Sequence, residues 1–104
     1  MRSEVLKGHV DLLVLATLRG GALHGYGIVE KLRGASEGAF DLAEGTVYPA
    51  LYRLEGSGLL ASQWTSLGGR RRRVYRLTSR GSAALARERK EWKAFARAIE
   101  AVVT

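Results

Sequence analysis

The last quarter of the chain is the sequence feature that most restricts the possible folds. From Thr78 or Ser79, either of which can cap a helix, the pattern predicts one long helix to about Val103. Its apolar residues repeat at spacings of seven and three and form one stripe: Leu85, Trp92, Phe95, Ile99 and Val102. A chain of 104 residues offers too small a body to bury this stripe. We therefore predict a partner helix, most simply from a second copy of the chain.

The alternative is that the long helix folds back onto a first predicted helix over residues 5–18. In that segment Leu12, Leu15 and Ala16 recur at helical spacing. Three further apolar residues widen the surface, so this helix should be buried on more than one side: Leu13, Val14 and Leu18. The two interpretations are compatible if the first helix also joins the dimer interface.

A second helix is predicted from about His24 to Leu32, followed by a turn over residues 34–38. Gly25 and Gly27 are poor helix formers, and such glycines permit close packing against a neighbouring helix. Tyr26 is predicted to be a structural residue between helices.

Residues 44–58 predict a short third helix with a distinctive outer face. Val47, Ala50, Leu51 and Leu54 fall on its inner face. The outer face and its flanks offer hydroxyls, a guanidinium and no carboxylate: Gly45, Thr46, Tyr48, Pro49, Tyr52 and Arg53. Asp41 and Glu44 have the spacing of a capping box. Because Pro49 lacks an amide proton, the helix either begins late or has a local irregularity, and we favour the irregularity.

A basic β-hairpin is predicted next. Residues 60–65 and 71–77 are the expected strands, joined through residues 66–69. Near the turn stand four consecutive arginines: Arg70, Arg71, Arg72 and Arg73. They form either a phosphate clamp or a solvated charged turn. A helix followed by a basic hairpin is typical of a winged helix, in which one element enters the DNA major groove and the other follows the backbone.

The charge balance agrees with a polyanionic partner. The formal net charge is +7, and four of the 17 cationic residues lie in one tetrapeptide, which localises the surface concerned. The chain has no cysteine and only His9 and His24, which argues against a metal site. It shows no recognisable catalytic cluster and no phosphate-binding loop, so we predict neither an enzyme nor a cofactor. The apolar run of residues 10–18 is interrupted by Asp11 and Thr17, so it predicts neither a signal peptide nor a membrane span, and we expect a cytoplasmic protein.

Taken together, these segments resemble the PadR family of bacterial winged-helix regulators over nearly the whole chain. The resemblance rests on the sequences LHGYGI at residues 23–28, GTVYPALYRLE at residues 45–55 and YRLTSRG at residues 75–81. It implies a homodimeric transcription factor, usually a repressor, that leaves DNA when a small molecule binds. The single last helix resembles the short-tailed subfamily, in which a tryptophan lines an aromatic pocket at the dimer centre; Trp92 holds the matching place. Two departures are Ala43, where the family often has a capping serine, and Val47, where leucine is common.

The predicted architecture is mainly α with a small β-hairpin wing. Residues 1–78 would form a winged helix-turn-helix DNA-binding domain, and residues 79–104 a dimerisation helix that forms one compact unit with the first helix. The predicted DNA-binding residues are Gly45, Thr46, Tyr48, Pro49, Tyr52, Arg53, Arg70, Arg71, Arg72 and Arg73. The predicted effector or dimer-interface residues are Leu12, Leu15, Leu85, Trp92, Phe95, Ile99 and Val102. The expected partners are double-stranded DNA on an inverted repeat, a second copy of the chain and a small aromatic or hydrophobic effector, with no membrane.

Several assignments keep an alternative. Arg53 is either a base-edge contact or a surface ion pair with Glu37, Asp41 or Glu44. Tyr48 and Tyr52 could pack half-buried instead of touching phosphates. Trp92 and Phe95 could bind an effector or only fill the dimer core. Two other functions fit the same residues. One is a dimeric protein that binds hydrophobic ligands, and the other is a winged helix that contacts protein or RNA, or that binds nucleic acid without sequence preference.

Overall fold

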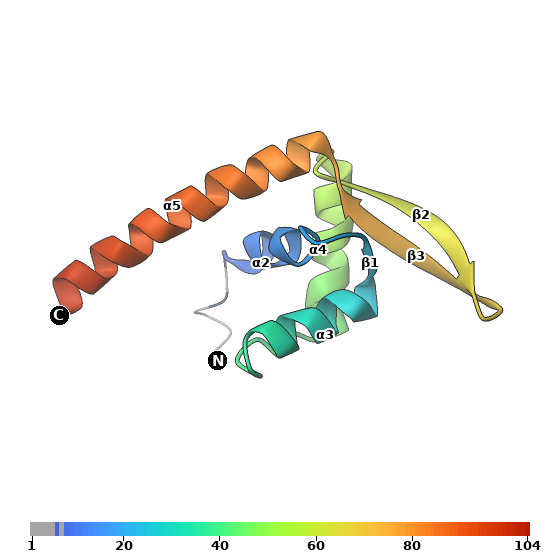
Figure 1. Ribbon diagram of the computed structural model, residues 1–104, viewed down its shortest axis with the longest axis horizontal. Helices are drawn as coiled ribbons and strands as arrows, with labels where there is room; N and C mark the ends of the chain where they lie inside the picture. The colour runs from blue at the N-terminus through green and yellow to red at the C-terminus, as the bar shows by residue number, and fades with distance from the viewer. Residues whose placement is uncertain (1–5, 7) are drawn as a thin grey trace.

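The computed structural model describes residue 6 and residues 8–104. Its elements are α2 (Val10–Thr17), β1 (Leu23–His24), α3 (Gly25–Ala35), α4 (Glu44–Gly56), β2 (Leu60–Leu67), β3 (Arg70–Leu77) and α5 (Ser79–Val103). In Figure 1, α2, α3 and α4 form the body, from which the β2–β3 hairpin and α5 extend in opposite directions. The molecule is therefore elongated, with principal extents of 54 × 28 × 21 Å. The predicted mainly α winged-helix fold is confirmed.

Helix α2 is shorter than the helix predicted over residues 5–18. It begins at Val10, and Gly8 just before it has a φ of +92°, which a regular helix does not contain. The parts of the prediction that fall on residues 5 and 7 lie outside the described residues. Val14, Leu15 and Leu18 are buried, as the widened apolar surface predicted.

The sheet has three strands where a two-stranded hairpin was predicted. The strand order is β1-β3-β2, and β1 pairs antiparallel with β3 through Leu23 opposite Tyr75 and His24 opposite Val74. A strand of two residues is too short to show the alternation that identifies strands in a sequence. Its consequence is that His24 lies beside the second strand of the hairpin.

The hairpin strands also run further toward the tip than predicted. Only Gly68 and Gly69 form the turn, with φ of 59° and 78°, which are the left-handed values that a tight hairpin turn requires at both positions. Leu67 then pairs with Arg70 in the backbone register, and Trp64 pairs with Arg73. The four arginines are therefore part of a regular strand, and alternate members point to opposite faces.

The helix-turn-helix differs from prediction at three points. Helix α3 continues to Ala35, and the turn after it is held by Ser36, whose hydroxyl donates to the Leu32 carbonyl at 2.7 Å. The capping-box prediction is wrong, because Ala43 occupies the N-cap of α4 without a side-chain bond and Asp41 instead binds Arg33 at 2.9 Å. The late-start alternative for α4 is also wrong, since the helix begins at Glu44 and contains Pro49.

The start of α3 packs directly on a tyrosine of α4. A Cβ atom added to the buried Gly25 would lie 2.5 Å from the Tyr48 ring and hydroxyl. We expect Gly25→Ala to lower the free energy of unfolding by about 1–2 kcal/mol, because the ring must shift out of its packed position. Urea denaturation measures the change.

Gly34 in the same helix is the matched control for this substitution. An added Cβ there would meet nothing within 4 Å. Gly34→Ala should therefore leave the stability unchanged or raise it by up to about 1 kcal/mol, since alanine favours the helix. If both variants were equally stable, Tyr48 would not constrain Gly25.

Among the residues that the structure describes, the fully buried side of α5 is confined to its first turns. The Thr78 hydroxyl accepts a bond from the Gly81 amide at 3.0 Å and donates to the Gly58 carbonyl at 2.7 Å, so the predicted cap is confirmed. Gly81, Ala84 and Leu85 are buried against the body. From Trp92 onward the large apolar side chains of α5 are exposed.

Candidate nucleic-acid interface

The outer face of α4 is exposed as predicted. Gly45, Thr46, Pro49, Tyr52 and Arg53 are all exposed, whereas Tyr48 is half-buried. Glu44, the first residue of the helix, is exposed as well. A carboxylate at this end of a helix is favoured by the helix dipole.

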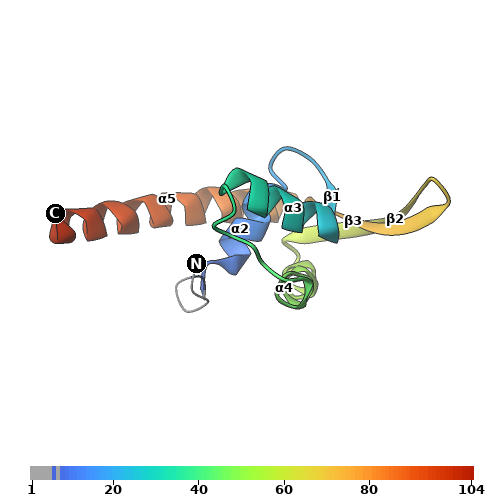
Figure 2. The same ribbon diagram turned by 90° about the horizontal axis from the view of Figure 1, so that it is seen from below.

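A cleft joins α4 to the hairpin. It has a volume of about 320 Å³ and is lined by His24, Gly25, Tyr48, Tyr52, Trp64, Arg71, Arg72, Arg73 and Tyr75. Figure 2 shows α4 nearly end-on, with the hairpin extending away from its side. Two predicted groups, the tyrosines of α4 and the arginines of the wing, therefore border one surface.

The tyrosines of this cleft differ in burial. Tyr52 is 62% exposed, while Tyr48 packs on Gly25. Burial raises the pKa of Tyr48, and the nearby carboxylate of Glu44 adds to the effect. The Tyr48 phenol therefore stays protonated at neutral pH, and its hydroxyl can donate to an anion.

The four wing arginines have different surroundings. Arg71 lies over the ring of Trp64 with its Cζ atom 4.8 Å from the centroid. Arg72 Nη1 lies 3.5 Å from His24 Nε2. Arg73 donates from Nε to the hydroxyl of Ser62 at 2.8 Å, and Arg70 is exposed beside the turn. The arginines are thus not four equivalent charges.

Arg53 forms an ion pair, but not with a predicted partner. It binds Asp11 of α2 instead of Glu37, Asp41 or Glu44. The pair is exposed, at 57% and 38% of the two side chains, so it contributes at most about 1 kcal/mol. Such a weak pair leaves the Arg53 guanidinium able to exchange Asp11 for another acceptor.

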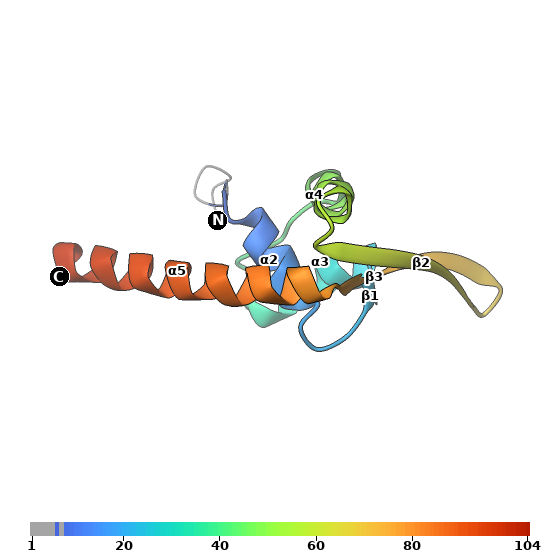
Figure 3. The same ribbon diagram turned by 90° about the horizontal axis from the view of Figure 1, so that it is seen from above.

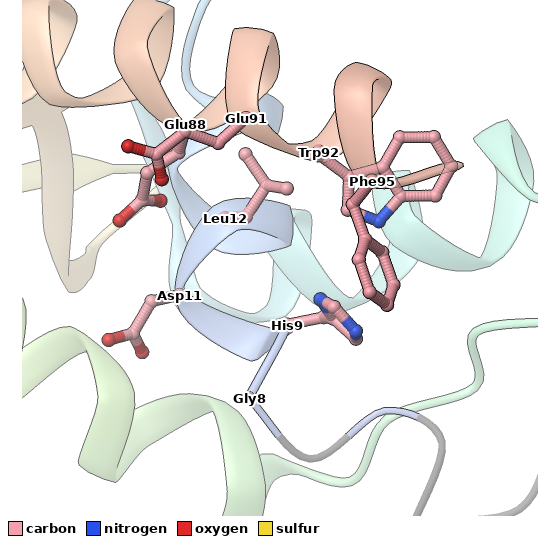
Figure 4. Close-up of a pocket in the computed structure, with 8 residues that line it drawn as sticks. All are labelled: Gly8, His9, Asp11, Leu12, Glu88, Glu91, Trp92 and Phe95. Carbon is pink, nitrogen blue, oxygen red and sulfur yellow. The ribbon is translucent and has the colours of Figure 1, made fainter. Parts of the chain in front are cut away.

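A second hollow lies between α2 and α5. It has a volume of about 350 Å³ and is lined by Gly8, His9, Asp11, Leu12, Glu88, Glu91, Trp92 and Phe95. Figure 4 shows the rings of Trp92, Phe95 and His9 on one side and the carboxylates of Asp11, Glu88 and Glu91 on the other. Burial raises the pKa of Glu88, and the charge of Asp11 adds to the effect. The hollow is acidic on a chain that is basic overall.

A larger apolar groove adjoins this hollow. It has a volume of about 600 Å³ and is lined by Leu6, His9, Leu12, Leu13, Ala16, Phe40, Arg89, Trp92, Lys93 and Phe95. Four predicted interface residues are exposed along α5: Trp92, Phe95, Ile99 and Val102. Leu15 and Leu85 are buried inside the protomer, at 0% and 3% exposure, so their assignment to an interface is wrong. Apolar spacing alone does not separate a protomer core from a subunit interface.

Sequence reasoning missed several residues of these surfaces. His24 enters the cleft through β1, which the sequence pattern does not reveal. Trp64 could have been placed there, since a hairpin with its turn at Gly68 and Gly69 sets Trp64 opposite Arg73. Asp11 was noted only as an interruption of an apolar run, although it holds Arg53. Tyr26 is 49% exposed, so its prediction as a residue packed between helices is wrong.

The described part of the chain offers neither a group of metal ligands nor a helix that could cross a membrane. Across residue 6 and residues 8–104, no three acidic, histidine or cysteine side chains are grouped as metal ligands. None of the helices in the same part of the chain is both long and apolar enough to cross a membrane.

A three-helix body followed by a β-hairpin wing defines this protein as a winged helix, extended here by α5. Residues 14–87 match the Transcriptional regulator PadR-like family. The chain is 36% identical over 96 residues to the Transcriptional regulator Rv3488 of Mycobacterium tuberculosis, covering 92% of this chain and 87% of that protein. The chain belongs to the PadR-like family of transcriptional regulators, as its motifs predict.

Solved structures agree with this membership. A transcriptional regulator from Clostridium thermocellum superimposes with a TM-score of 0.90 at 30% identity, covering 100% of this chain and 99% of that one. The PadR protein of Bacillus subtilis, solved in complex with operator DNA, gives a TM-score of 0.69 at 25% identity, over 75% of this chain and 45% of that one.

Proposed function

We propose that this protein is a sequence-specific DNA-binding regulator that acts as a homodimer on an inverted repeat. The observation that carries the proposal is the shared cleft, in which two tyrosines of α4, Tyr48 and Tyr52, border the same surface as the wing arginines Arg71, Arg72 and Arg73. The Bacillus subtilis PadR structure supports it, because that protein holds operator DNA. In this arrangement α4 enters the major groove, while residues 70–72 meet flanking phosphates.

Each predicted residue of α4 has a role consistent with its exposure. Gly45 and Thr46 lie in the first turn, where backbone amides and a hydroxyl can bind a phosphate. Tyr48 donates from the cleft, and Tyr52 with Pro49 contacts the DNA surface. Arg53 exchanges Asp11 for a base edge, since a guanidinium can bind guanine through two bonds.

The dimer uses the exposed stripe of α5. Residues 79–104 form the dimerisation helix and residues 1–78 the DNA-binding unit. Trp92, Phe95, Ile99 and Val102 are between 46% and 85% exposed, which is unusual for four large apolar residues on one helix. In the dimer, the partner's helix covers them and enters the apolar groove beside α2. Two-fold symmetry then sets the half-sites about one turn, roughly 10 base pairs, apart.

Selection from randomised duplex DNA tests this function. The purified protein is incubated with the library near physiological salt, and the bound DNA is sequenced. Enrichment of an inverted repeat is the expected result and supplies the operator for later experiments. Binding without enrichment would contradict sequence specificity and favour a non-specific nucleic-acid-binding winged helix.

Arg53→Ala tests the proposed base contact. We expect it to reduce discrimination at a single base position by about 1–3 kcal/mol, because a bidentate arginine contact is lost. The measurement is the affinity for the operator and for operators with single base changes. Arg70→Ala is the control and should weaken all sequences equally. If Arg53→Ala also weakened all sequences equally, Arg53 would be a phosphate contact.

We further propose that the acidic and aromatic hollow binds a small aromatic or hydrophobic effector and that the protein represses transcription until the effector binds. The exposed Trp92 beside Asp11, Glu88 and Glu91 supports a flat guest that carries positive charge. Trp64→Phe leaves Trp92 as the only tryptophan, so its fluorescence reports binding directly. If the fluorescence did not change with any compound of a chemically broad panel, the hollow would be part of the dimer interface and not an effector site. Transcription from the selected operator, with and without the bound compound, tests repression.

A further inference from the structure

We propose that Glu55 and Ser62 are positioning residues that hold Arg73 within the protein and thereby fix the wing to the end of α4. The consequence for DNA rests on the proposed function. The anchoring itself is a property of the free protein and can be tested without DNA.

Three side chains from three elements form a closed set of contacts. Ser62 of β2 donates its hydroxyl proton to Glu55 Oε2 of α4 at 2.6 Å. Arg73 of β3 donates from Nε to the Ser62 oxygen at 2.8 Å. The triangle is completed by Arg73 Nη2, which lies 3.5 Å from Glu55 Oε1. Ser62 thus donates its one hydroxyl proton to Glu55 and accepts the Arg73 proton with a lone pair of its oxygen.

The hairpin register brings these groups to one face. Ser62 lies opposite Tyr75, and Trp64 lies opposite Arg73, so all four side chains project toward the same side of the two strands. The Trp64 ring covers Arg73, with the Cζ atom 5.6 Å from its centroid. Tyr75 on the same face is buried, at 1% exposure. The anchor therefore sits where the hairpin leaves the core.

Because it is less exposed to solvent, we expect the Arg73–Glu55 pair to be held more firmly than the Arg53–Asp11 pair. The side chains of Arg73 and Glu55 are 39% and 28% exposed, against 57% and 38% for Arg53 and Asp11. Lower exposure reduces screening by water and salt. Glu55 also lies in the last turn of α4, where the helix dipole disfavours a carboxylate. Its neutralisation by Arg73 removes that penalty.

If Arg73 is held by Glu55 and Ser62, it is not one of the phosphate contacts of the proposed DNA interface. The charge of Arg73 is balanced by Glu55, and its Nε proton is already bonded. The arginines at positions 70–72 remain to meet phosphates, and Arg73 acts through the direction of the wing. Figure 3 shows the hairpin extending well beyond the body, so the direction set at its base decides where the tip lies.

Hydrogen exchange in the free protein tests the anchor. We expect Glu55→Gln to speed amide exchange in residues 60–77 by about fivefold, the effect of losing roughly one net hydrogen bond. Arg70→Gln, in the same hairpin but outside the triangle, should leave these rates at the wild-type values. Amides of residues 84–92 in α5 report whether the variant is folded and should not change. Equal hairpin exchange in Glu55→Gln and wild type would overturn the anchor.

Salt-dependent binding to the selected operator tests the consequence. The logarithm of the affinity falls with the logarithm of the salt concentration, and each phosphate contact contributes about 0.9 to the slope. Arg73→Lys should weaken binding by about fivefold with an unchanged slope, because lysine keeps the charge and loses the Nε bond to Ser62. Arg71→Gln is the control and should lower the slope by about 0.9.

In Glu55→Gln, the direction of the change in DNA affinity distinguishes the two explanations. Removing a negative charge near DNA would by itself tighten binding, whereas loss of the anchor weakens it. Tighter binding of Glu55→Gln, or a slope lowered by about 0.9 in Arg73→Gln, would overturn the inference. If the wild-type protein bound no DNA, the proposed function would fail, and hydrogen exchange would still decide the anchor.

Discussion

A protein with Phe95→Glu and Ile99→Glu should be a monomer at concentrations where the wild-type protein forms the proposed dimer. The two side chains are 55% and 46% exposed, with Phe95 at the edge of the apolar groove beside α2 and Ile99 one turn further along α5. In a two-fold dimer each substitution occurs twice in the same interface. With about 2 kcal/mol lost at each of the four sites, the dissociation constant rises by roughly 500,000-fold. Light scattering coupled to gel filtration measures the mass.

The control places the same charge on the other side of the same helix. Ala101 is exposed and lies about 180° from Trp92 around the helix axis, so Ala101→Glu should remain dimeric. The monomer should also lose most of its affinity for the inverted repeat, because the two half-sites no longer bind as a unit. A double variant that stayed dimeric would show that the interface lies elsewhere.

Replacing Arg70, Arg71 and Arg72 together with glutamine should weaken DNA binding by about 100-fold at physiological salt. This corresponds to about 1 kcal/mol for each exposed phosphate contact. The salt slope should fall by about 2.7, the sum of three contacts. Because phosphates carry no sequence information, the loss should be the same for the operator and for unrelated duplexes. Fluorescence anisotropy over a series of salt concentrations measures both quantities.

A second triple variant distinguishes direct phosphate contacts from the effect of the protein's overall charge on DNA binding. Arg87, Lys90 and Arg97 are exposed on α5, and their replacement by glutamine removes the same three charges far from the wing. This variant should change the affinity slightly and leave the salt slope close to the wild-type value. If the two variants behaved alike, the wing would contribute only to the general field of the protein.

The sequence predicts the helices and the hairpin because their patterns are long. The bounds of α5 agree with the expected start at Ser79 and end near Val103, since 25 residues of one helical pattern leave little ambiguity. Short features are missed for the opposite reason. The two residues of β1 carry no period, and the break before α2 depends on one glycine conformation at Gly8.

The candidate site is less predictable, because it depends on partners distant in sequence. Arg53 is exposed as predicted, but its partner Asp11 lies 42 residues away and no local spacing connects them. Arg73 looks identical to its neighbours in the sequence and differs only through Glu55 and Ser62. Leu15 and Leu85 follow the same stripes as exposed residues, so their burial depends on how far the body extends along each helix.

The junction between β3 and α5 has a mechanical consequence. One residue, Thr78, separates the end of the strand at Leu77 from the start of the helix at Ser79, and its hydroxyl bonds to the Gly81 amide in α5 and to the Gly58 carbonyl between α4 and β2. We therefore expect the strand and the helix to move together as one rigid unit. In the proposed dimer, a change in the angle at which the two α5 helices cross would displace both wing tips at once, because the one-residue connection at Thr78 leaves no flexible linker between helix and strand.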